Sequence, residues 1–203
     1  FQAKQTAQAR RDLANSLKSL ARTQREQGKN SEAEKSLKDL AEHQRKLSAG
    51  LPPGSSGAKA QKKELAEVLQ NLGAVCLRQK KLEEARDAYE KESELWRKLL
   101  EERNALRNAL ADQEQLAGSL RNLGIIYSKR LQWEQAEDFY LRATEHLRHI
   151  LDQGRETAQR RAELAESLFG LGGAQFNQTK IQAAEESLNE VVSHTDVVEP
   201  QSF

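Results

Sequence analysis

The sequence predicts an all-α fold, a right-handed α-solenoid of four antiparallel helix–turn–helix repeats with lengthened helices. One pattern recurs four times: three leucines at helical spacing, an alanine thirteen residues on, and a Leu or Tyr four residues after that. Its period exceeds that of an ordinary helical hairpin, and turn-forming residues separate several of the expected helices. The four copies are Leu13, Leu17, Leu20, Ala33, Leu37; Leu65, Leu69, Leu72, Ala85, Tyr89; Leu116, Leu120, Leu123, Ala136, Tyr140; and Leu164, Leu168, Leu171, Ala184, Leu188.

The period of the pattern predicts long helices. The third leucines of the copies are separated by 52, 51 and 48 residues. An ordinary two-helix repeat of this kind has about 34 residues. The additional residues are mostly Glu, Lys, Arg, Gln, Leu and Ala, which favour helices, so each helix is expected to be about two turns longer.

The copies divide the chain into a single solenoid domain with repeat units at about 1–50, 58–105, 108–153 and 157–195. In the first unit, Ser31 and Glu34 have the spacing of a capping box, which predicts a second helix over 31–48. Residues 49–58 follow and are rich in Pro, Gly and Ser, so we expect a flexible loop there.

Fewer residues in the sequence indicate where the helices of the later units begin and end. Between the second and third units no Gly or Pro occurs from Lys80 to Ala117, and the turn is expected near Asn104 to Asp112. Gly154 is suited to end a helix and Thr157 to begin the next. Thr179 and Gln182 repeat the capping-box spacing and predict a last helix over 180–195, while a frayed tail is expected over 196–203.

Composition excludes several classes of function. The 203 residues carry 32 Lys and Arg against 31 Asp and Glu, so no net field favours nucleic acid or an anionic membrane. No apolar stretch approaches the roughly 20 residues of a membrane-spanning helix. The single cysteine, Cys76, lies on a leucine stripe, where it is expected to be buried and inert, and it suits a reducing, cytoplasmic location. Because the chain has no Met, we expect it to be part of a longer or processed product.

Charge is unevenly distributed along the chain. The first 50 residues carry 11 bases against 6 acids, whereas no Lys or Arg follows Lys180. The acids after that point are Glu185, Glu186, Glu190, Asp196 and Glu199. This polarity predicts either two differently solvated ends or a contact between the basic first unit and the acidic last unit of another copy.

Two segments, LQNLGAVCLRQKKLEEARDAYEKE and LRNLGIIYSKRLQWEQAEDFYLRA, resemble tetratricopeptide repeats. The resemblance rests on a Leu-Gly pair in the first helix, an aromatic such as Tyr127 after it, and the alanine and aromatic of the second helix. The family's next small residue is matched by Ala143, but the second copy has Glu92 there. The long period is similar to that of the arrays of kinesin light chains and of bacterial signalling proteins.

In this family the first helices of the repeats line a concave groove that binds other proteins. The resemblance therefore implies that the following residues form a partner-binding groove, basic and amide-rich in the early copies and aromatic in the fourth: Lys18, Arg22, Gln70, Asn71, Arg78, Arg121, Asn122, Lys129, Phe169 and Asn177. Asn71 and Asn122 are expected either to hold a peptide backbone or to lie on a solvated face. The family's carboxylate clamp is not expected, because Glu67, Gly118 and Glu166 occupy positions where it needs bases.

The remaining candidates favour structural roles. Phe169 and Phe176 are seven residues apart, and at least one is expected in the core. Trp96 and Trp133 are expected to be packing residues. His146 and His149 lack a third metal ligand, and adjacent acids on a helix point apart, so we expect no metal site, no cofactor and no catalytic residues.

The sequence thus predicts a non-enzymatic scaffold that binds a peptide or helix of a partner protein in its groove. The alternative is a homo-oligomerisation or regulatory module of a larger multidomain signalling protein. Nucleic acid is not an expected partner, because the basic first unit lacks exposed aromatics on which bases stack.

Overall fold

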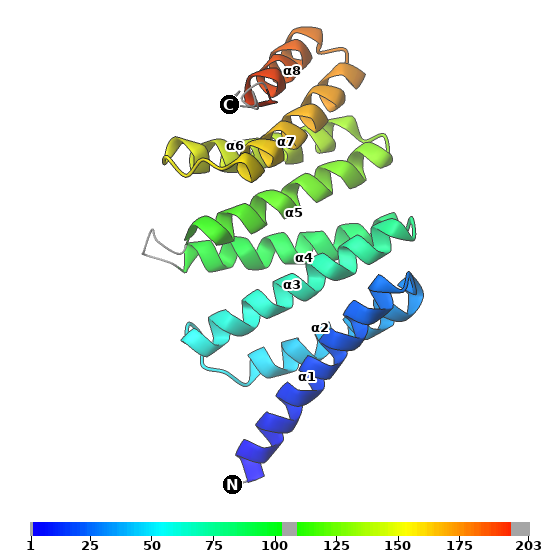
Figure 1. Cartoon of the computed structure of the whole chain (residues 1–203), viewed down its shortest axis with the longest axis vertical. Coiled ribbons are helices and arrows are strands. Elements are labelled where there is room, and N and C mark those ends of the chain that lie inside the picture. The colour runs from blue at the N-terminus through cyan, green and yellow to red at the C-terminus, as the bar shows by residue number, and fades with distance from the viewer. Residues whose placement is uncertain (1, 103–108, 196–203) are drawn as a thin grey trace, which may run out of the picture. The chain divides into compact units, whose positions relative to one another are not determined.

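A computed structural model describes residues 2–102 and 109–195 of the chain, and this part is made of eight helices without a strand. Figure 1 shows the helices in chain order. They are α1 (Gln2–Glu26), α2 (Asn30–Ala49), α3 (Ser56–Arg78), α4 (Leu82–Glu101), α5 (Ala109–Lys129), α6 (Trp133–Asp152), α7 (Ala158–Asn177) and α8 (Ile181–Thr195). Most have 20 or more residues, as the long period predicted.

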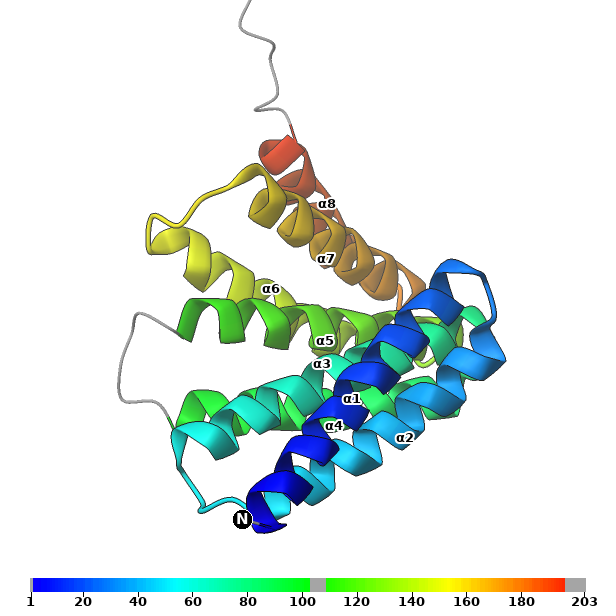
Figure 2. The same ribbon diagram turned by 60° about the horizontal axis from the view of Figure 1, so that its bottom comes forward.

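The helices form two compact units, Phe1–Glu102 (unit 1) and Arg103–Phe203 (unit 2), and each is described here by itself. In unit 1, α1 packs on α2, α2 on α3 and α3 on α4, and in unit 2 α5 to α8 follow the same order. The first helices of the two hairpins of unit 2, α5 and α7, are also neighbours. Figure 2 shows these hairpins from a second direction. Each unit therefore consists of two helical hairpins in series, which confirms the all-α helical-repeat class.

Helix ends differ in part from the expected boundaries. The Pro- and Gly-rich loop covers only residues 50–55, because the hydroxyl of Ser55 accepts a hydrogen bond from the Ala58 N–H at 3.1 Å and starts α3 early. Of the turn expected near Asn104 to Asp112, residues 104–108 lie outside the described residues, and the remainder belongs to α5. The expected tail over 196–203 also lies outside them.

The alanine and leucine pattern forms most of the core, although Leu188 of the fourth copy is 38% exposed. Ala33, Ala85, Ala136 and Ala184 are all buried, and so are the three leucines of the second, third and fourth copies. In the first copy, however, Leu13 and Leu20 are 50% and 48% exposed, so the expectation of a buried stripe is wrong there. The helices α3 and α7 each pack against a preceding helix, whereas no described helix precedes α1.

The glycine of the Leu-Gly pair sits where two helices approach closely. A Cβ atom at Gly73 would come within 2.7 Å of the Tyr89 ring, and one at Gly124 within 2.8 Å of the Tyr140 ring. In the fourth copy the same position, Gly172, faces Leu188 at 2.9 Å. These distances leave no room for a side chain, which explains why the pattern requires glycine.

Each hairpin turns through one residue in the left-handed conformation: Gly28, Lys80, Leu131 and Thr179, with φ between 59° and 72°. The residue after it closes the turn by donating its N–H to the carbonyl five residues earlier, as in Lys81 N to Cys76 O at 2.9 Å and Lys180 N to Gln175 O at 3.0 Å. The same turn geometry therefore recurs in all four hairpins, although only the first uses glycine.

Both expected capping boxes are wrong. The helix α2 begins at Asn30, so Ser31 lies inside it and donates to Gln79 Oε1 at 3.2 Å. Thr179 is in the left-handed turn and its hydroxyl donates to its neighbour's carbonyl, Gln178 O, at 2.6 Å. In contrast, Thr157 caps α7 as expected, since its hydroxyl accepts the Arg160 N–H at 3.2 Å.

Glu34 bridges the two repeats of unit 1 instead of capping a helix. Its buried carboxylate accepts hydrogen bonds from Gln79 and Lys81, at 2.9 and 2.6 Å, and from Lys38 at 2.5 Å. Burial alone would raise the pKa of Glu34, but these three bonds lower it to about 2. The contact links α2 to the turn between α3 and α4.

Unit 2 repeats this bridge with the same residue types. Glu137 of α6 accepts from Gln178 at 2.7 Å and from Lys180 at 2.6 Å, in the turn between α7 and α8. On α4 the corresponding position is Arg86, which pairs with Glu83 and Asp87 of its own helix. The carboxylate bridge therefore occurs once inside each unit.

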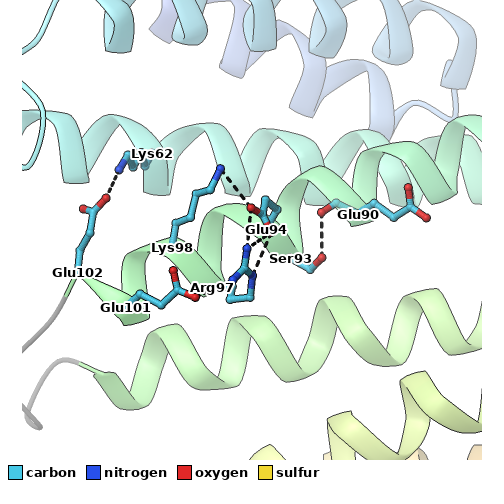
Figure 3. A network of polar contacts seen from close by, with 8 residues as sticks. All are labelled: Lys62, Glu90, Ser93, Glu94, Arg97, Lys98, Glu101 and Glu102. Atoms are coloured by element: carbon cyan, nitrogen blue, oxygen red, sulfur yellow. Dashed lines mark hydrogen bonds and ion pairs between the residues drawn. The ribbon is translucent and has the colours of Figure 1, made fainter.

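The solvated face of α4 carries a network of ion pairs, shown in Figure 3. Arg97 binds Glu94 at 2.7 Å and Glu101 at 2.6 Å, and Lys98 binds Glu94 at 3.1 Å. Lys62 of α3 reaches Glu102 at the end of α4. Exposed pairs three or four residues apart stabilise a helix by only about 0.2–0.5 kcal/mol each. We therefore assign these ion pairs to the modest stabilisation of α4 and not to a binding site.

Candidate functional site

An apolar groove of about 660 Å³ lies within unit 2 between its four helices. The helix α7 contributes the largest share of the wall, and α5, α6 and α8 supply the rest. The lining residues are Arg121, Ile125, Ser128, Trp133, Tyr140, Ala165, Glu166, Phe169, Gly170, Gly173, Ala174, Asn177 and Val191. A mostly apolar cavity of this size with a few polar groups at its edge is typical of a ligand site.

Tyr140 lines the groove, and its ring is held between two glycines. A Cβ atom at Gly170 of α7 would come within 2.5 Å of its ring, and one at Gly124 of α5 within 2.8 Å. The ring is only 5% exposed, and burial raises the pKa of its hydroxyl against the effect of a hydrogen bond with Ser128. Tyr140 is thus a rigid part of the groove rather than a movable anchor.

Gly173 leaves the groove open one turn further along α7. A Cβ atom at this position would meet no heavy atom within 4 Å, and the residue is exposed. Glycine inside a helix costs about 0.5–1 kcal/mol relative to alanine. The space above Gly173 is therefore available to a side chain from outside the chain.

The rim of the groove combines one exposed aromatic with polar groups. Phe169 is 66% exposed beside the opening. Arg121 of α5 donates to Glu166 of α7 at 2.7 Å, and Asn177 donates through Nδ2 to the Gly173 carbonyl at 2.7 Å. The amide oxygen of Asn177 and the outer edge of the ion pair remain as polar contacts for a ligand.

Unit 1 fills the corresponding position with side chains. Asn71 precedes Leu72 as Gly170 precedes Leu171. Its Oδ1 accepts from Arg25 Nη1, and its Nδ2 donates to Glu67 O at 2.8 Å. The Arg121–Glu166 pair also has a counterpart here, since Lys18 lies 3.3 Å from Glu67. The bases expected to make the groove positive are therefore largely paired.

The structure brings three of the ten expected site residues to one place: Arg121, Phe169 and Asn177 all line the unit 2 groove. The other two in unit 2, Asn122 and Lys129, lie on α5 outside its lining. In unit 1, Arg22 pairs with Glu26 at 2.9 Å along α1. The remaining four lie on α1 and α3: Lys18 and Arg78, which are exposed, and Gln70 and Asn71, which are half-buried.

The aromatic residues are placed differently from the expectation. Neither Phe169 nor Phe176 is in the core, since they are 66% and 61% exposed. Each follows a buried residue of α7, Leu168 or Gln175, and a step of one residue turns a side chain about 100° around a helix. Trp96 is buried as expected, but Trp133 is half-buried and lines the groove.

The sequence pattern does not identify several of the residues that line the groove. The repeat pattern includes Tyr140 but does not indicate that it lines a groove, and it gives no role to Gly170 or Gly173. The signal was present in the segment FGLGG (169–173), because three glycines within one helix are costly unless close packing or an open surface requires them.

Other reactive groups are isolated from the groove. Cys76 is fully buried, and burial raises its pKa to about 11, as expected for an inert thiol. Burial lowers the pKa of His146, and His149 contacts Gln153 at 2.8 Å. Among residues 2–102 and 109–195, no three His, Cys, Asp or Glu side chains gather as metal ligands would.

Comparison with sequence families identifies the repeats. Two tetratricopeptide-repeat descriptions match the chain, one over residues 119–153 and one over 66–91. These two segments are tetratricopeptide repeats. The first match spans the end of α5, all of α6 and the Arg121 to Tyr140 side of the groove. No curated protein matches the sequence closely enough to count as a relative.

Solved structures agree with this fold. The apo form of RapI superposes with a TM-score of 0.70 at 12% identity, covering 94% of this chain and 44% of RapI. BtubC (BKLC) from P. vanneervenii superposes with a TM-score of 0.53 at 15% identity, covering 100% of this chain and 92% of BtubC. The chain thus spans less than half the length of RapI. These likenesses support the α-solenoid class of the fold.

Tetratricopeptide repeats support a scaffold for protein–protein interaction. None of the helices within the described ranges combines the length and the apolar character needed to cross a lipid bilayer.

Proposed function

We propose that the chain is a non-enzymatic, cytoplasmic scaffold that binds a peptide or helix of a partner protein in the unit 2 groove. The observation that carries this proposal is the open, apolar cavity beside an exposed phenylalanine, with its floor formed by a rigidly held tyrosine. A rigid apolar site binds without the cost of ordering its own side chains.

The lining supports a ligand with one apolar side chain as anchor. The open space above Gly173 accepts such a side chain, and Phe169 and Ile125 line the same groove. Aromatic and aliphatic anchors in desolvated pockets contribute most of the affinity at protein interfaces. The Arg121–Glu166 pair and Asn177 at the rim would then contact the polar side or the backbone of the ligand.

The proposal is tested with peptides selected from a random library against the 203-residue chain. Their affinity is measured by titration calorimetry for the wild type and for Gly173→Leu, which places a side chain in the groove. Gly118→Leu is the matched control, because a Cβ at Gly118 also meets no atom within 4 Å but the residue lies outside the groove.

We expect Gly173→Leu and Phe169→Ala each to weaken binding by about tenfold or more, equivalent to about 1.4 kcal/mol. Gly118→Leu should bind as the wild type does. Equal affinity of all variants for every selected peptide would contradict the proposal, and so would failure to select any peptide that binds the folded chain.

A further inference from the structure

A second cavity, of about 680 Å³, lies within unit 1 between α1, α2 and α3. It shares no lining residue with the unit 2 groove. Its wall combines bases and amides with the apolar side chains of Ala14, Leu47, Leu51 and Ala60. A cavity of this size and mixed lining is in the range of small-molecule sites, so we asked what its polar groups would recognise.

In unit 2 an ion pair occupies the corresponding place. Arg160 of α7 donates to Glu114 of α5, and these residues lie four and two positions before the first leucine of their repeats. In unit 1 the same positions hold Gln61 of α3 and Arg11 of α1. Gln61 donates instead to Glu64 of its own helix, at 3.4 Å. Gln61 and Arg11 both line the cavity, so an arginine faces it where unit 2 has a glutamate.

An amide replaces an apolar core residue in the wall of the cavity. Gln44 of α2 is 5% exposed, and the second and third repeats have the buried residues Trp96 and Leu147 at this position. Its Nε2 donates to Glu64 Oε2 at 2.9 Å, the same oxygen that Gln61 contacts. Glu64 thus holds the nitrogen of both amides, and within the described residues neither Oε1 has a hydrogen-bond partner. A buried acceptor without a donor is unfavourable, so the site favours a ligand with an N–H.

The charged residues of the cavity favour a ligand with one negative charge. Three bases and one acid line it: Arg10, Arg11, Lys46 and Glu64. Lys46 also pairs with Glu42 at 3.4 Å. Arg10 and Arg11 are exposed, and no ion pair joins either of them to another side chain that the structure describes. A guanidinium binds a carboxylate through two parallel hydrogen bonds, so these arginines are suited to hold a carboxylate.

Side-chain bonds close the space between α1 and α3 beyond the cavity. Lys18 of α1 lies 3.3 Å from Glu67 of α3, and Arg25 of α1 donates to Asn71 of α3. At its other end the cavity is bounded by the loop that follows α2. The opening therefore suits a compact ligand and not a long peptide.

We propose that the unit 1 cavity binds a small N-acyl amino acid, which combines a carboxylate, a neighbouring N–H and an apolar chain. The carboxylate accepts hydrogen bonds from Arg10 and Arg11. The amide N–H donates to Oε1 of Gln44, and the acyl chain packs against Leu47 and Leu51. This site is separate from the unit 2 groove and does not depend on the binding of a partner protein there.

Titration calorimetry of the 203-residue chain with N-hexanoylglycine tests the proposal. Two matched compounds each remove one group: N-hexanoylglycinamide has no carboxylate, and N-hexanoylsarcosine has no N–H. Arg11→Gln removes a cation of the cavity, and Gln44→Leu installs the residue type of Leu147. Arg45→Gln is the control, because Arg45 is an exposed base of α2 outside the cavity. Circular dichroism confirms that each variant is folded.

We expect the wild type to bind N-hexanoylglycine saturably at a single site. Removing the carboxylate and the Arg11→Gln change should each weaken binding by about tenfold, as for the loss of a charged hydrogen bond, whereas Arg45→Gln should not. The sarcosine compound should bind the wild type about threefold more weakly, but Gln44→Leu should bind both compounds equally. Absence of saturable binding, equal affinity of Arg11→Gln and Arg45→Gln, or a preference for the N–H compound that persists in Gln44→Leu would each overturn the proposal.

The C-terminal residue of a polypeptide offers the same carboxylate and N–H, so a longer peptide that ends in Leu-Gly forms a further arm of the titration. It should bind more weakly than N-hexanoylglycine, because the Lys18–Glu67 pair closes the space that its chain would need. Tighter binding of the peptide would assign the cavity to protein C-termini and overturn the assignment to a small ligand.

Discussion

The buried carboxyl of Glu92 should make the stability of the chain depend on pH. Glu92 is fully buried on α4, where the third repeat has Ala143. Its Oε1 accepts the Trp96 Nε1–H at 3.3 Å, and its Oε2 has no hydrogen-bond partner. Burial raises the pKa of Glu92 to about 8, against a smaller effect of the Trp96 bond. The carboxyl is therefore protonated in the folded chain at neutral pH.

The sign and size of the effect follow from proton binding. Above pH 4.5 the unfolded chain loses this proton, whereas the folded chain keeps it until about pH 8. The folded state thus binds more protons in this window, so its stability falls as pH rises. Each pH unit in the window is worth about 1.4 kcal/mol, which amounts to about 3 kcal/mol between pH 4.5 and pH 7.

The measurement compares the wild type with Glu92→Gln, which keeps an acceptor for Trp96 but cannot ionise. Free energies of unfolding from urea titrations are determined at intervals from pH 5 to pH 8. The difference between the two chains removes the contribution of all other groups. We expect Glu92→Gln to gain about 3 kcal/mol relative to the wild type over this range. A difference that stays constant with pH would refute the assignment of a raised pKa.

Three further predictions concern the packing and the turns. Gly170→Ala should destabilise the chain by about 1–3 kcal/mol through contact with the Tyr140 ring, whereas Gly173→Ala should stabilise it by about 0.5–1 kcal/mol, and thermal unfolding of the two variants measures both. The low pKa of Glu34 should contribute stability that is complete above pH 4.5 and is lost as pH falls toward 2. In a Glu34→Gln variant the free energy of unfolding, measured by urea titration, should therefore change less between pH 4.5 and pH 2 than it does in the wild type. Thr179→Gly should raise the unfolding temperature because a β-branched residue is strained at φ 63°, and an unchanged or lower temperature would contradict that strain.

The candidate site could be predicted only in part from the sequence. The family resemblance placed Arg121, Phe169 and Asn177 on a binding face, and the structure brings them to one groove. It also grouped Asn71 with them, but that side chain is bound to Arg25 in unit 1. Residue type and spacing do not show which polar side chains bind each other across two helices, because that depends on the distance between helices far apart in the sequence.

The sequence alone determined the number of repeats, the long helices and the alanine and glycine positions of close contact, because periodicity and side-chain size act within and between neighbouring helices. Only the tertiary structure decided which leucines are buried and where a groove opens. Leu13 and Leu65 have the same place in the repeat, yet only Leu65 is covered, because a preceding helix packs on α3 and none of the described helices packs on α1 in that way. Burial depends on the neighbours that a position receives, and a repeat pattern specifies the position but not the neighbour.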